Sequence, residues 1–251
     1  MRSEQTDFIW RISVKNQFIQ GLMIDWKKIE ADSYLRKIEA IKDVHTLDFN
    51  KSVTFFVGEN GSGKSTLLEA IAVAYGFNPE GGTRNYSFST YDSHSELCDA
   101  VTIIKGVRRP RVGYFLRAES FYNVATKERE YADIQHPSQE YHEKSHGESF
   151  LAIAQNYMKA GGIFIFDEPE AALSPQRQLT LLMDIYKCAK DGAQFIIVTH
   201  SPILLGMPDA EIYSFDNGEV HLCEYEDTDS YIVTELFINN RDILLHKLLN
   251  E

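Results

Sequence analysis

The chain has 251 residues, a formal net charge of −12 and a hydrophobic fraction of 43%, which suits one large α/β domain over 1–251 with a full core of its own. The acidic balance excludes a generally basic, DNA-coating surface but leaves room for a local basic patch. We expect a soluble protein of the cytoplasm for three reasons. The three cysteines are scattered, the first residues are polar and do not resemble a signal peptide, and no apolar run approaches the roughly 20 residues that span a bilayer.

The first 57 residues alternate short apolar runs with turns, and this pattern predicts mostly strands. The runs cover 8–14, 18–24, 44–49 and 53–57. The last run is short and apolar, as a buried parallel strand is. We therefore expect a β-rich lobe over 1–57 that ends in the core of the sheet.

The segment after this strand matches the phosphate-binding loop G-x-x-x-x-G-K-[ST] at every constrained position. It reads Gly58, Glu59, Asn60, Gly61, Ser62, Gly63, Lys64, Ser65, and Thr66 follows. The glycines permit a tight backbone that turns N–H groups onto an anion, the lysine reaches the outer phosphates, and the serine hydroxyl is a ligand for Mg2+. Apolar residues at helical spacing follow, so a triphosphate would bind at a helix N-terminus.

The loop by itself leaves two questions open. A glycine-rich turn that matches by chance is the alternative to a phosphate site, and the strand and helix on either side argue against it. The loop does not distinguish kinases, GTPases, motor ATPases and transport ATPases, which share it.

The middle of the chain is more polar. Residues 77–94 predict a loop, and strands are expected at 101–104 and 112–116. One dense basic cluster lies near them, and it consists of Lys105, Arg108, Arg109 and Arg111. A solvated loop is favoured over a contact with nucleic acid or a partner. A polar segment over 122–147 then leads into a helix around 150–157.

Two apolar strands in the second half end in residues that can serve a nucleotide. The strand at 163–166 is followed by Asp167, which fits the carboxylate that Mg2+ needs beside a phosphate loop, and by Glu168, which can position or deprotonate the attacking water. The strand at 195–199 is followed by His200, which can hydrogen-bond the γ-phosphate or the water. Solvated acids and a structural histidine are the alternatives, and the phosphate loop upstream favours the functional roles.

The start of a predicted helix lies, in the sequence, between the phosphate loop and the acidic strand. The run Ser145-His146-Gly147-Glu148 is a capping box, S-x-x-E, ahead of the helix at 150–157. A serine and a glycine at an exposed helix N-terminus also form an anion site, which could meet a phosphate from another subunit.

The remaining elements are predicted from local signals. Ser174 is the expected N-cap of a helix that has Pro175 in its first turn. The pair Asn217-Gly218 predicts a hairpin with a type I′ turn. The last twenty residues have a helical pattern of apolar side chains.

Four motifs of the chain resemble those of the ABC-type ATPases in their order and spacing. They are the phosphate loop, the helix start at Ser145, Phe166-Asp-Glu-Pro169 and Thr199-His200. The resemblance covers about 34–202, and 54–70 with 115–123 are most similar to the stand-alone bacterial ATPases related to DNA-repair and chromosome-organising ATPases rather than to transporter subunits. It implies an α/β fold with a P-loop NTPase core sheet over 58–117 and 161–251. An N-terminal antiparallel β subdomain and a small helical insertion over 118–160 would complete it.

Two departures from the family pattern concern the site. The signature helix start differs from Leu-Ser-Gly-Gly-Gln, since Lys144, His146 and Glu148 replace three of its residues. The family glutamine that contacts Mg2+ is missing after the strand at 112–116, and Glu119 is the candidate replacement. By the same resemblance, Tyr34 is a candidate to stack on adenine, and Arg84 with Asn85 are candidates for an arginine loop.

The resemblance implies an ATPase that uses ATP and Mg2+ and forms a head-to-tail homodimer on binding ATP. Ser145 and Gly147 of one copy would complete the site of the other, while Ser65, Asp167 and Glu119 would surround the metal. An ATP-switched scaffold acting on nucleic acid or a protein partner is the main alternative. A small-molecule kinase would have no use for Ser145 or His200, and a transporter partner is disfavoured because the segment between Glu119 and Ser145 is short and polar.

Overall fold

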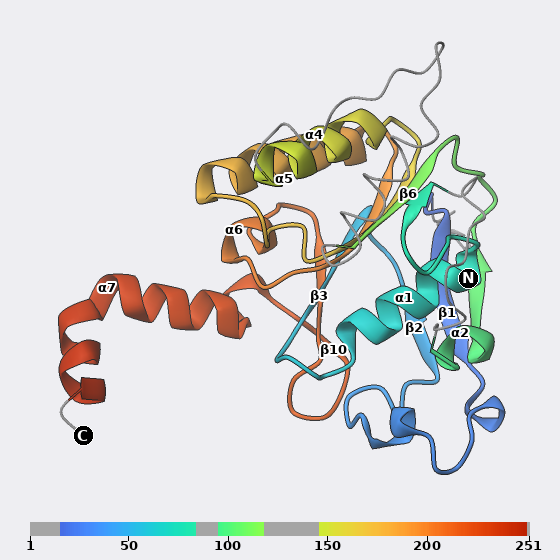
Figure 1. Ribbon diagram of the computed structural model, residues 1–251, viewed down its shortest axis with the longest axis horizontal. Helices are drawn as coiled ribbons and strands as arrows, with labels where there is room; N and C mark the ends of the chain where they lie inside the picture. Colours follow the sequence, from blue (N-terminus) through green and yellow to red (C-terminus); the bar gives the residue numbers. More distant parts are fainter. Residues whose placement is uncertain (1–15, 84–94, 118–145, 250–251) are drawn as a thin grey trace, which may run out of the picture.

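The computed structural model describes residues 16–83, 95–117 and 146–249, with helices on both faces of a large sheet (Figure 1). The strands are β1 (Ile19–Ile24), β2 (Thr46–Asp48), β3 (Val53–Val57), β4 (Gly82–Thr83), β5 (Val101–Lys105), β6 (Gly113–Arg117), β7 (Ile163–Asp167), β8 (Gln194–Val198), β9 (Glu211–Ser214) and β10 (His221–Cys223). The helices are α1 (Lys64–Tyr75), α2 (Leu97–Ala100), α4 (His146–Tyr157), α5 (Pro175–Lys190), α6 (Pro202–Leu205) and α7 (Asp229–Leu249). Short 3-10 turns are η1 (Trp26–Lys28), η2 (Tyr34–Lys37) and η4 (Tyr225–Asp227).

The large sheet has the order β10-β9-β3-β8-β7-β6-β4, and a separate small sheet has the order β2-β1-β5. In the large sheet β9, β3, β8, β7 and β6 run parallel, while β10 and β4 pair antiparallel at its two edges. The small sheet is antiparallel throughout. The expected α/β class with a parallel-rich core sheet and an antiparallel β subdomain is therefore confirmed.

Helices cover both faces of the large sheet, which is why β3 and β8 are buried at every position. Side chains of α1 and of the small sheet form one apolar core with one face. Side chains of α4, α5 and α6 form a second core with the other face. Figure 1 shows this layering, with α4 and α5 on the far side of the sheet from α1.

A buried glutamine joins the two sheets. Gln194 begins β8 and is 1% exposed. Its Oε1 accepts hydrogen bonds from the backbone N–H groups of Phe18 and Ile19 at 2.8 and 2.9 Å, and its Nε2 donates to the carbonyl oxygen of Ile19 at 2.8 Å. One side chain therefore satisfies three backbone groups at the start of β1 and fixes the small sheet against the large one.

Most elements fall within two residues of the ranges that the sequence predicts. The strands expected at 18–24, 53–57, 101–104, 112–116, 163–166 and 195–199 are present. The Oγ of Ser174 accepts a hydrogen bond from the N–H of Arg177, so the predicted N-cap of α5 is confirmed. The interpretation of 77–94 as loop missed β4, a two-residue edge strand too short to leave a pattern. The run at 8–14 lies outside the described residues.

The predicted hairpin at Asn217-Gly218 is present, but its connection is longer than a two-residue turn. Strands β9 and β10 pair only as far as Ser214 and His221, and 215–220 connects them. Asn217 and Gly218 do have positive φ values of 57° and 79°, as a type I′ turn requires. Asp216 lies in this connection, and its carboxylate accepts hydrogen bonds from the N–H of Glu59 and the Oγ of Ser214.

The last element is the predicted C-terminal helix, α7, with 21 residues. Its backbone leaves helical geometry at Asn240, where φ is −131° and ψ is 30°. Figure 1 shows that α7 extends away from the rest of the molecule and bends in the middle.

The hydrogen bonds of Gln194 between the two sheets lead to a prediction about stability. The substitution Gln194→Leu keeps the volume but leaves two buried N–H groups and one carbonyl without partners, so we expect the free energy of unfolding to fall by at least about 2 kcal/mol. Urea denaturation measures this difference. The control is Gln155→Leu, which removes an exposed hydrogen bond to Asp184 and should change stability by less than about 1 kcal/mol. Equal effects of the two substitutions would contradict the role of Gln194.

Candidate functional site

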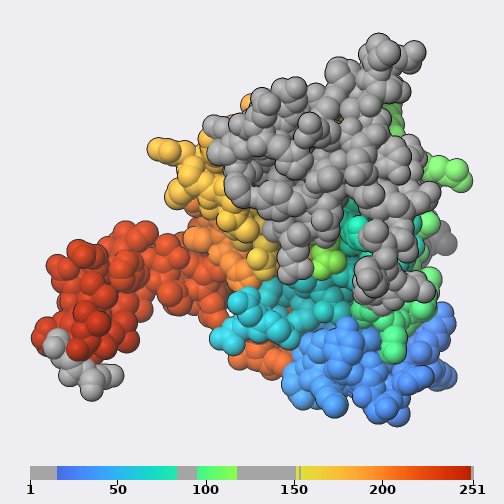
Figure 2. All heavy atoms as spheres, viewed as in Figure 1, coloured from blue at the N-terminus to red at the C-terminus, as the bar shows by residue number. Residues whose placement is uncertain are grey.

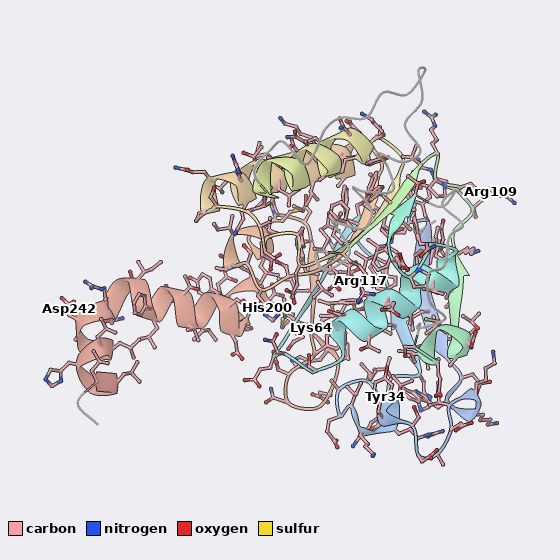
Figure 3. The ribbon with its side chains drawn as sticks, viewed as in Figure 1. Tyr34, Lys64, Arg109, Arg117, His200 and Asp242 are labelled. Atoms are coloured by element: carbon pink, nitrogen blue, oxygen red, sulfur yellow. The ribbon has the colours of Figure 1, made fainter. Side chains whose placement is uncertain are left out.

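The carboxyl ends of three parallel strands meet at one edge of the large sheet. Strand β3 leads into the phosphate loop, β7 ends in Asp167, and β8 is followed by His200 two residues later. Because β3, β8 and β7 are adjacent and parallel, the three segments lie side by side. Figure 3 shows Lys64, Arg117 and His200 converging on this edge from different elements.

The loop has the backbone that its glycines predict. Gly58, Gly61 and Gly63 have φ values of 136°, 83° and 95°, which side chains rarely permit. Gly63 is the left-handed N-cap of α1. A Cβ atom on Gly63 would lie 2.9 Å from Cγ2 of Ile38, so the loop also needs glycine here to pack against the segment after η2.

Lys64 is buried inside the loop with 4% of its surface exposed. Its Nζ donates hydrogen bonds to the carbonyl oxygens of Gly58 and Glu59 at 2.7 and 2.6 Å. Burial lowers the pKa of Lys64 from its ordinary value, while the surrounding carboxylates, among them Glu168 and Asp167, oppose this shift. A cation is thus held where the loop and the acidic strand meet.

Ser65 and Asp167 form the link between the loop and the acidic strand. The Oγ of Ser65 donates a hydrogen bond to Oδ1 of Asp167 at 2.9 Å. A hydroxyl and a carboxylate side by side are the hard oxygen ligands that Mg2+ prefers. The two residues therefore fit the metal site that the sequence predicts.

An arginine that the sequence analysis did not single out lies beside this pair. Arg117 ends β6, in register with Asp167 on β7. Its Nε lies 3.9 Å from Oδ2 of Asp167, and its Nη1 donates to Oε2 of Glu69 on α1 at 2.6 Å. A basic residue at the carboxyl end of a core strand was the available signal, and only the strand order shows that it lies beside Asp167.

Glu168 and His200 come together at the outer part of the edge. Nε2 of His200 lies 3.8 Å from Oε1 of Glu168, and both side chains are partly exposed. Glu168 has a positive φ of 48°, an unusual value for a residue with a side chain. Strain of this kind concentrates at functional sites, because it fixes a side chain in one direction.

Glu170 supports this arrangement through a contact with His200 that the sequence did not predict. Its Oε1 accepts a hydrogen bond from the backbone N–H of His200 at 2.6 Å. Burial raises the pKa of Glu170 above its ordinary value. The carboxyl group therefore fixes the position of the His200 backbone at an electrostatic cost.

Asp216 anchors the beginning of the loop. Its Oδ1 accepts a hydrogen bond from the N–H of Glu59 at 3.0 Å, and its Oδ2 accepts one from Ser214 at 2.9 Å. A cavity of about 610 Å3 lies between this hairpin, the loop and η2, and Tyr34 lines it. Tyr34 is 56% exposed and its hydroxyl is hydrogen-bonded to Ser95 at 3.2 Å. Its role in stacking on adenine stays a prediction.

Several predicted residues cannot be placed at the site. Glu119, Ser145, Arg84 and Asn85 lie outside the described residues. Gly147 lies in the first turn of α4. Within the described ranges, no cluster of three His, Cys, Asp or Glu side chains could hold a metal ion, and the predicted metal ligands that lie in these ranges are Ser65 and Asp167.

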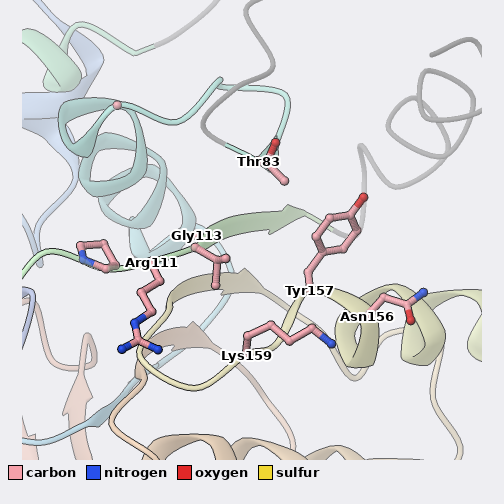
Figure 4. Close-up of a pocket in the computed structure, with 9 residues that line it drawn as sticks. Thr83, Arg111, Gly113, Asn156, Tyr157 and Lys159 are labelled. Carbon is pink, nitrogen blue, oxygen red and sulfur yellow. The ribbon is translucent and has the colours of Figure 1, made fainter. Parts of the chain in front are cut away.

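The basic cluster lies away from this edge. Its four members are exposed, and Figure 3 shows Arg109 at the right-hand edge of the molecule, away from Lys64. Arg111 also lines a cavity of about 510 Å3 with Tyr157 and Lys159 (Figure 4). That cavity includes Gly113 at the amino end of β6. Arg117, at the carboxyl end of the same strand, lies beside Asp167.

Two family models match the chain. One, described as "AAA domain", matches 34–157, and the other, described as "AAA domain, putative AbiEii toxin, Type IV TA system", matches 117–206. Together they include the phosphate loop, the acidic strand and His200.

Curated relatives are similar at lower identity. The "Arabinose import ATP-binding protein AraG" of Pseudomonas savastanoi pv. phaseolicola is 27% identical over 184 residues, which are 65% of this chain and 36% of that protein. The chain thus spans about a third of the length of this relative. The "Phosphate import ATP-binding protein PstB 1" of Vibrio cholerae is 26% identical over 243 residues, which are 84% of this chain and 86% of that protein.

Solved structures with a similar arrangement include an SMC head domain from Thermotoga maritima, with a TM-score of 0.43 and 13% identity over 83% of this chain and 99% of that one. Another is cbiO1 from Clostridium perfringens, with a TM-score of 0.44 and 15% identity over 79% of this chain and 88% of that one. In the part of this chain that the structure describes, we find no helix with the length and apolar character of a membrane span.

The buried carboxyl of Glu170 generates a pH prediction. Because the folded-state pKa is raised, the stability contributed by this group is fully present below the ordinary pKa of a glutamate and is lost as the pH rises through the raised value. Glu170→Gln cannot ionise and keeps an oxygen for the N–H of His200. We expect it to be more stable than the wild type above neutral pH, with a difference that shrinks as the pH falls toward 4 to 5.

Urea unfolding at a series of pH values measures this difference. The control Glu30→Gln changes an exposed glutamate and should give a pH profile parallel to that of the wild type. A Glu170→Gln variant that is less stable than the wild type at pH 8 would show that the ionised carboxylate stabilises the fold.

Proposed function

Because the chain carries a P-loop ATPase domain of the AAA/ABC type, we propose that it binds ATP with Mg2+ at the carboxyl edge of the large sheet and hydrolyses it within a head-to-tail homodimer. The single observation that best supports this proposal is the hydrogen bond between Ser65 and Asp167. It unites the phosphate loop with the acidic strand in the way that a nucleotide-bound cation needs.

Lys64 is the residue that we assign to the outer phosphates. Its ammonium group is held by two backbone carbonyls of the loop. Phosphate oxygens carry more negative charge than carbonyl oxygens and form stronger hydrogen bonds with a cation. The lysine therefore exchanges weak acceptors for strong ones when a triphosphate binds, while the N–H groups from Gly58 to Thr66 surround the phosphates.

Ser65 and Asp167 are assigned to Mg2+, which when bound supplies positive charge to the phosphate oxygens. Arg117 holds the second carboxylate oxygen of Asp167 through an ion pair. This contact keeps the carboxylate turned toward Ser65 and lowers the local excess of negative charge. Glu119 remains our candidate for a further group near the metal.

Glu168 and His200 are assigned to the hydrolysis step. A partly exposed carboxylate can accept a proton from the attacking water, and general-base catalysis of this kind typically contributes about 10²–10⁴-fold to the rate. His200 lies close enough to Glu168 to orient it or to donate to the γ-phosphate. The strained backbone at Glu168 supports this assignment.

A second copy of the chain would supply the remaining contact. Helix α4 packs with α5 on the face of the sheet opposite to α1, whose start holds the phosphates (Figure 1). The N-terminus of α4, with Ser145 and Gly147, is therefore assigned to a phosphate bound by the partner. In a two-fold dimer this contact occurs twice and gives two composite sites.

A subunit that powers an importer is the second candidate function. The two curated relatives described above are named as import ATP-binding proteins, and this observation favours a membrane partner despite the short polar segment before Ser145. The composite site would be the same in both cases, and only the partner would differ.

Mixed dimers test the proposal directly. Lys64→Ala should abolish one half of the site, and Gly147→Asp should abolish the other half because its charge repels the phosphate. Each variant alone should be inactive. When the two are co-expressed in equal amounts, half of the dimers contain one intact site, so phosphate release should recover to roughly a quarter of the wild-type rate.

The control co-expresses Lys64→Ala with Ser65→Ala, two changes in the same half, and should remain inactive. A mixture of Lys64→Ala and Gly147→Asp without recovered activity would contradict the composite site if the wild type itself releases phosphate. A wild type that binds ATP but releases none would instead identify an ATP-switched module.

A further inference from the structure

Among the described residues, helix α7 contacts the rest of the molecule mainly near its beginning, at η4 and α6. The rings of Tyr225 and Tyr231 meet edge to face with centroids 4.8 Å apart, and the buried Thr228 accepts a hydrogen bond from the N–H of Tyr231 at 3.3 Å. Beyond this base, α7 has no buried residue over its whole length. Figure 2 shows it projecting from the body of the molecule.

The surface of α7 is apolar to a degree that is unusual for a projecting helix. Eight of its large apolar side chains are between 42% and 77% exposed. They are Ile232, Val233, Leu236, Phe237, Ile238, Ile243, Leu248 and Leu249. The first four have the spacing i, i+1, i+4, i+5 and share one side, whereas Ile238 lies on another side. Helices with apolar residues on more than one side are normally buried against other elements.

The distribution of charged residues along α7 indicates which kind of partner covers its apolar surface. The first half carries Asp229 and Glu235 and no base, and the second half carries Arg241 and Lys247 with a single acid, Asp242. Two copies that cross in opposite directions would place each acidic half against a basic half. A membrane surface fits less well, because helices that bind anionic lipid carry many Lys and Arg on the polar face.

The length of α7 is also compatible with self-association. Stable interfaces use roughly 20–30 residues from each partner, and α7, with 21 residues, approaches this range when both of its arms take part. The bend at Asn240 gives each copy two helical arms, so a pair would bring four arms together around the exposed apolar side chains.

We infer that α7 is a dimerisation element that packs against α7 of a second copy, antiparallel and about a two-fold axis, with no need for nucleotide. This contact is separate from the head-to-tail contact proposed above, which depends on ATP, on the phosphate loop and on the start of α4. Either contact can exist without the other.

The test is sedimentation velocity of the full chain without nucleotide and with EDTA, over about 1–100 μM, a range that covers typical specific dimers. The wild type should be a dimer. Val233→Glu introduces a charge at a position that is 62% exposed, and should raise the dimer dissociation constant by at least about tenfold because the charge would be buried at the interface.

The matched control is Val107→Glu, the same change at a position that is 87% exposed and outside α7, and it should sediment like the wild type. Because both valines are exposed, neither change should alter the far-UV circular dichroism. A monomeric wild type over this range would overturn the inference, and so would a dimer that Val233→Glu leaves intact or that Val107→Glu weakens equally. Binding of a monomeric wild type to phosphatidylserine vesicles, lost in Val233→Glu, would assign α7 to a membrane instead.

Discussion

The hydrogen bond from Ser65 to Asp167 joins positions that are 102 residues apart, and the rest of the site depends on it. It forms because β3, β8 and β7 are adjacent and parallel, so that segments far apart in the sequence emerge at one edge. Helices on both faces keep these strands buried and make their register rigid. A loop built for an anion and a strand ending in carboxylates are thereby held within hydrogen-bond distance of each other.

The same edge concentrates charge of both signs. Lys64 and Arg117 lie among Glu69, Asp167, Glu168 and Asp216, and each cation has at least one acidic group near it. Glu170 differs from these acids, because its Oε1 accepts a hydrogen bond from the backbone N–H of His200 and burial raises its pKa. Mg2+ bound together with a triphosphate would offset part of the negative charge of the phosphates, and Lys64 and Arg117 supply further positive charge at this edge.

The sequence predicts the residues whose role is local and misses those whose role depends on the fold. The loop, the acidic pair and His200 follow directly from short motifs that begin where a strand ends, and the structure brings them together at one edge. Arg117, Glu69, Glu170 and Asp216 act through partners between 30 and 157 residues away, so their contacts follow only from the strand order. The same holds for Gln194, whose partners are about 175 residues away. Helix α7 was predicted correctly as a helix, but its apolar pattern gave no sign that it would project into solvent.

The central claim is that this edge binds a nucleoside triphosphate through Lys64. Calorimetric titration with Mg-ATP tests it most directly when Lys64→Ala is compared with Glu168→Gln and with Lys187→Ala, an exposed lysine of α5. We expect Lys64→Ala to weaken binding by at least about 100-fold, since it removes charged hydrogen bonds to the phosphates. Glu168→Gln and Lys187→Ala should bind like the wild type. Unchanged affinity in Lys64→Ala would contradict the claim.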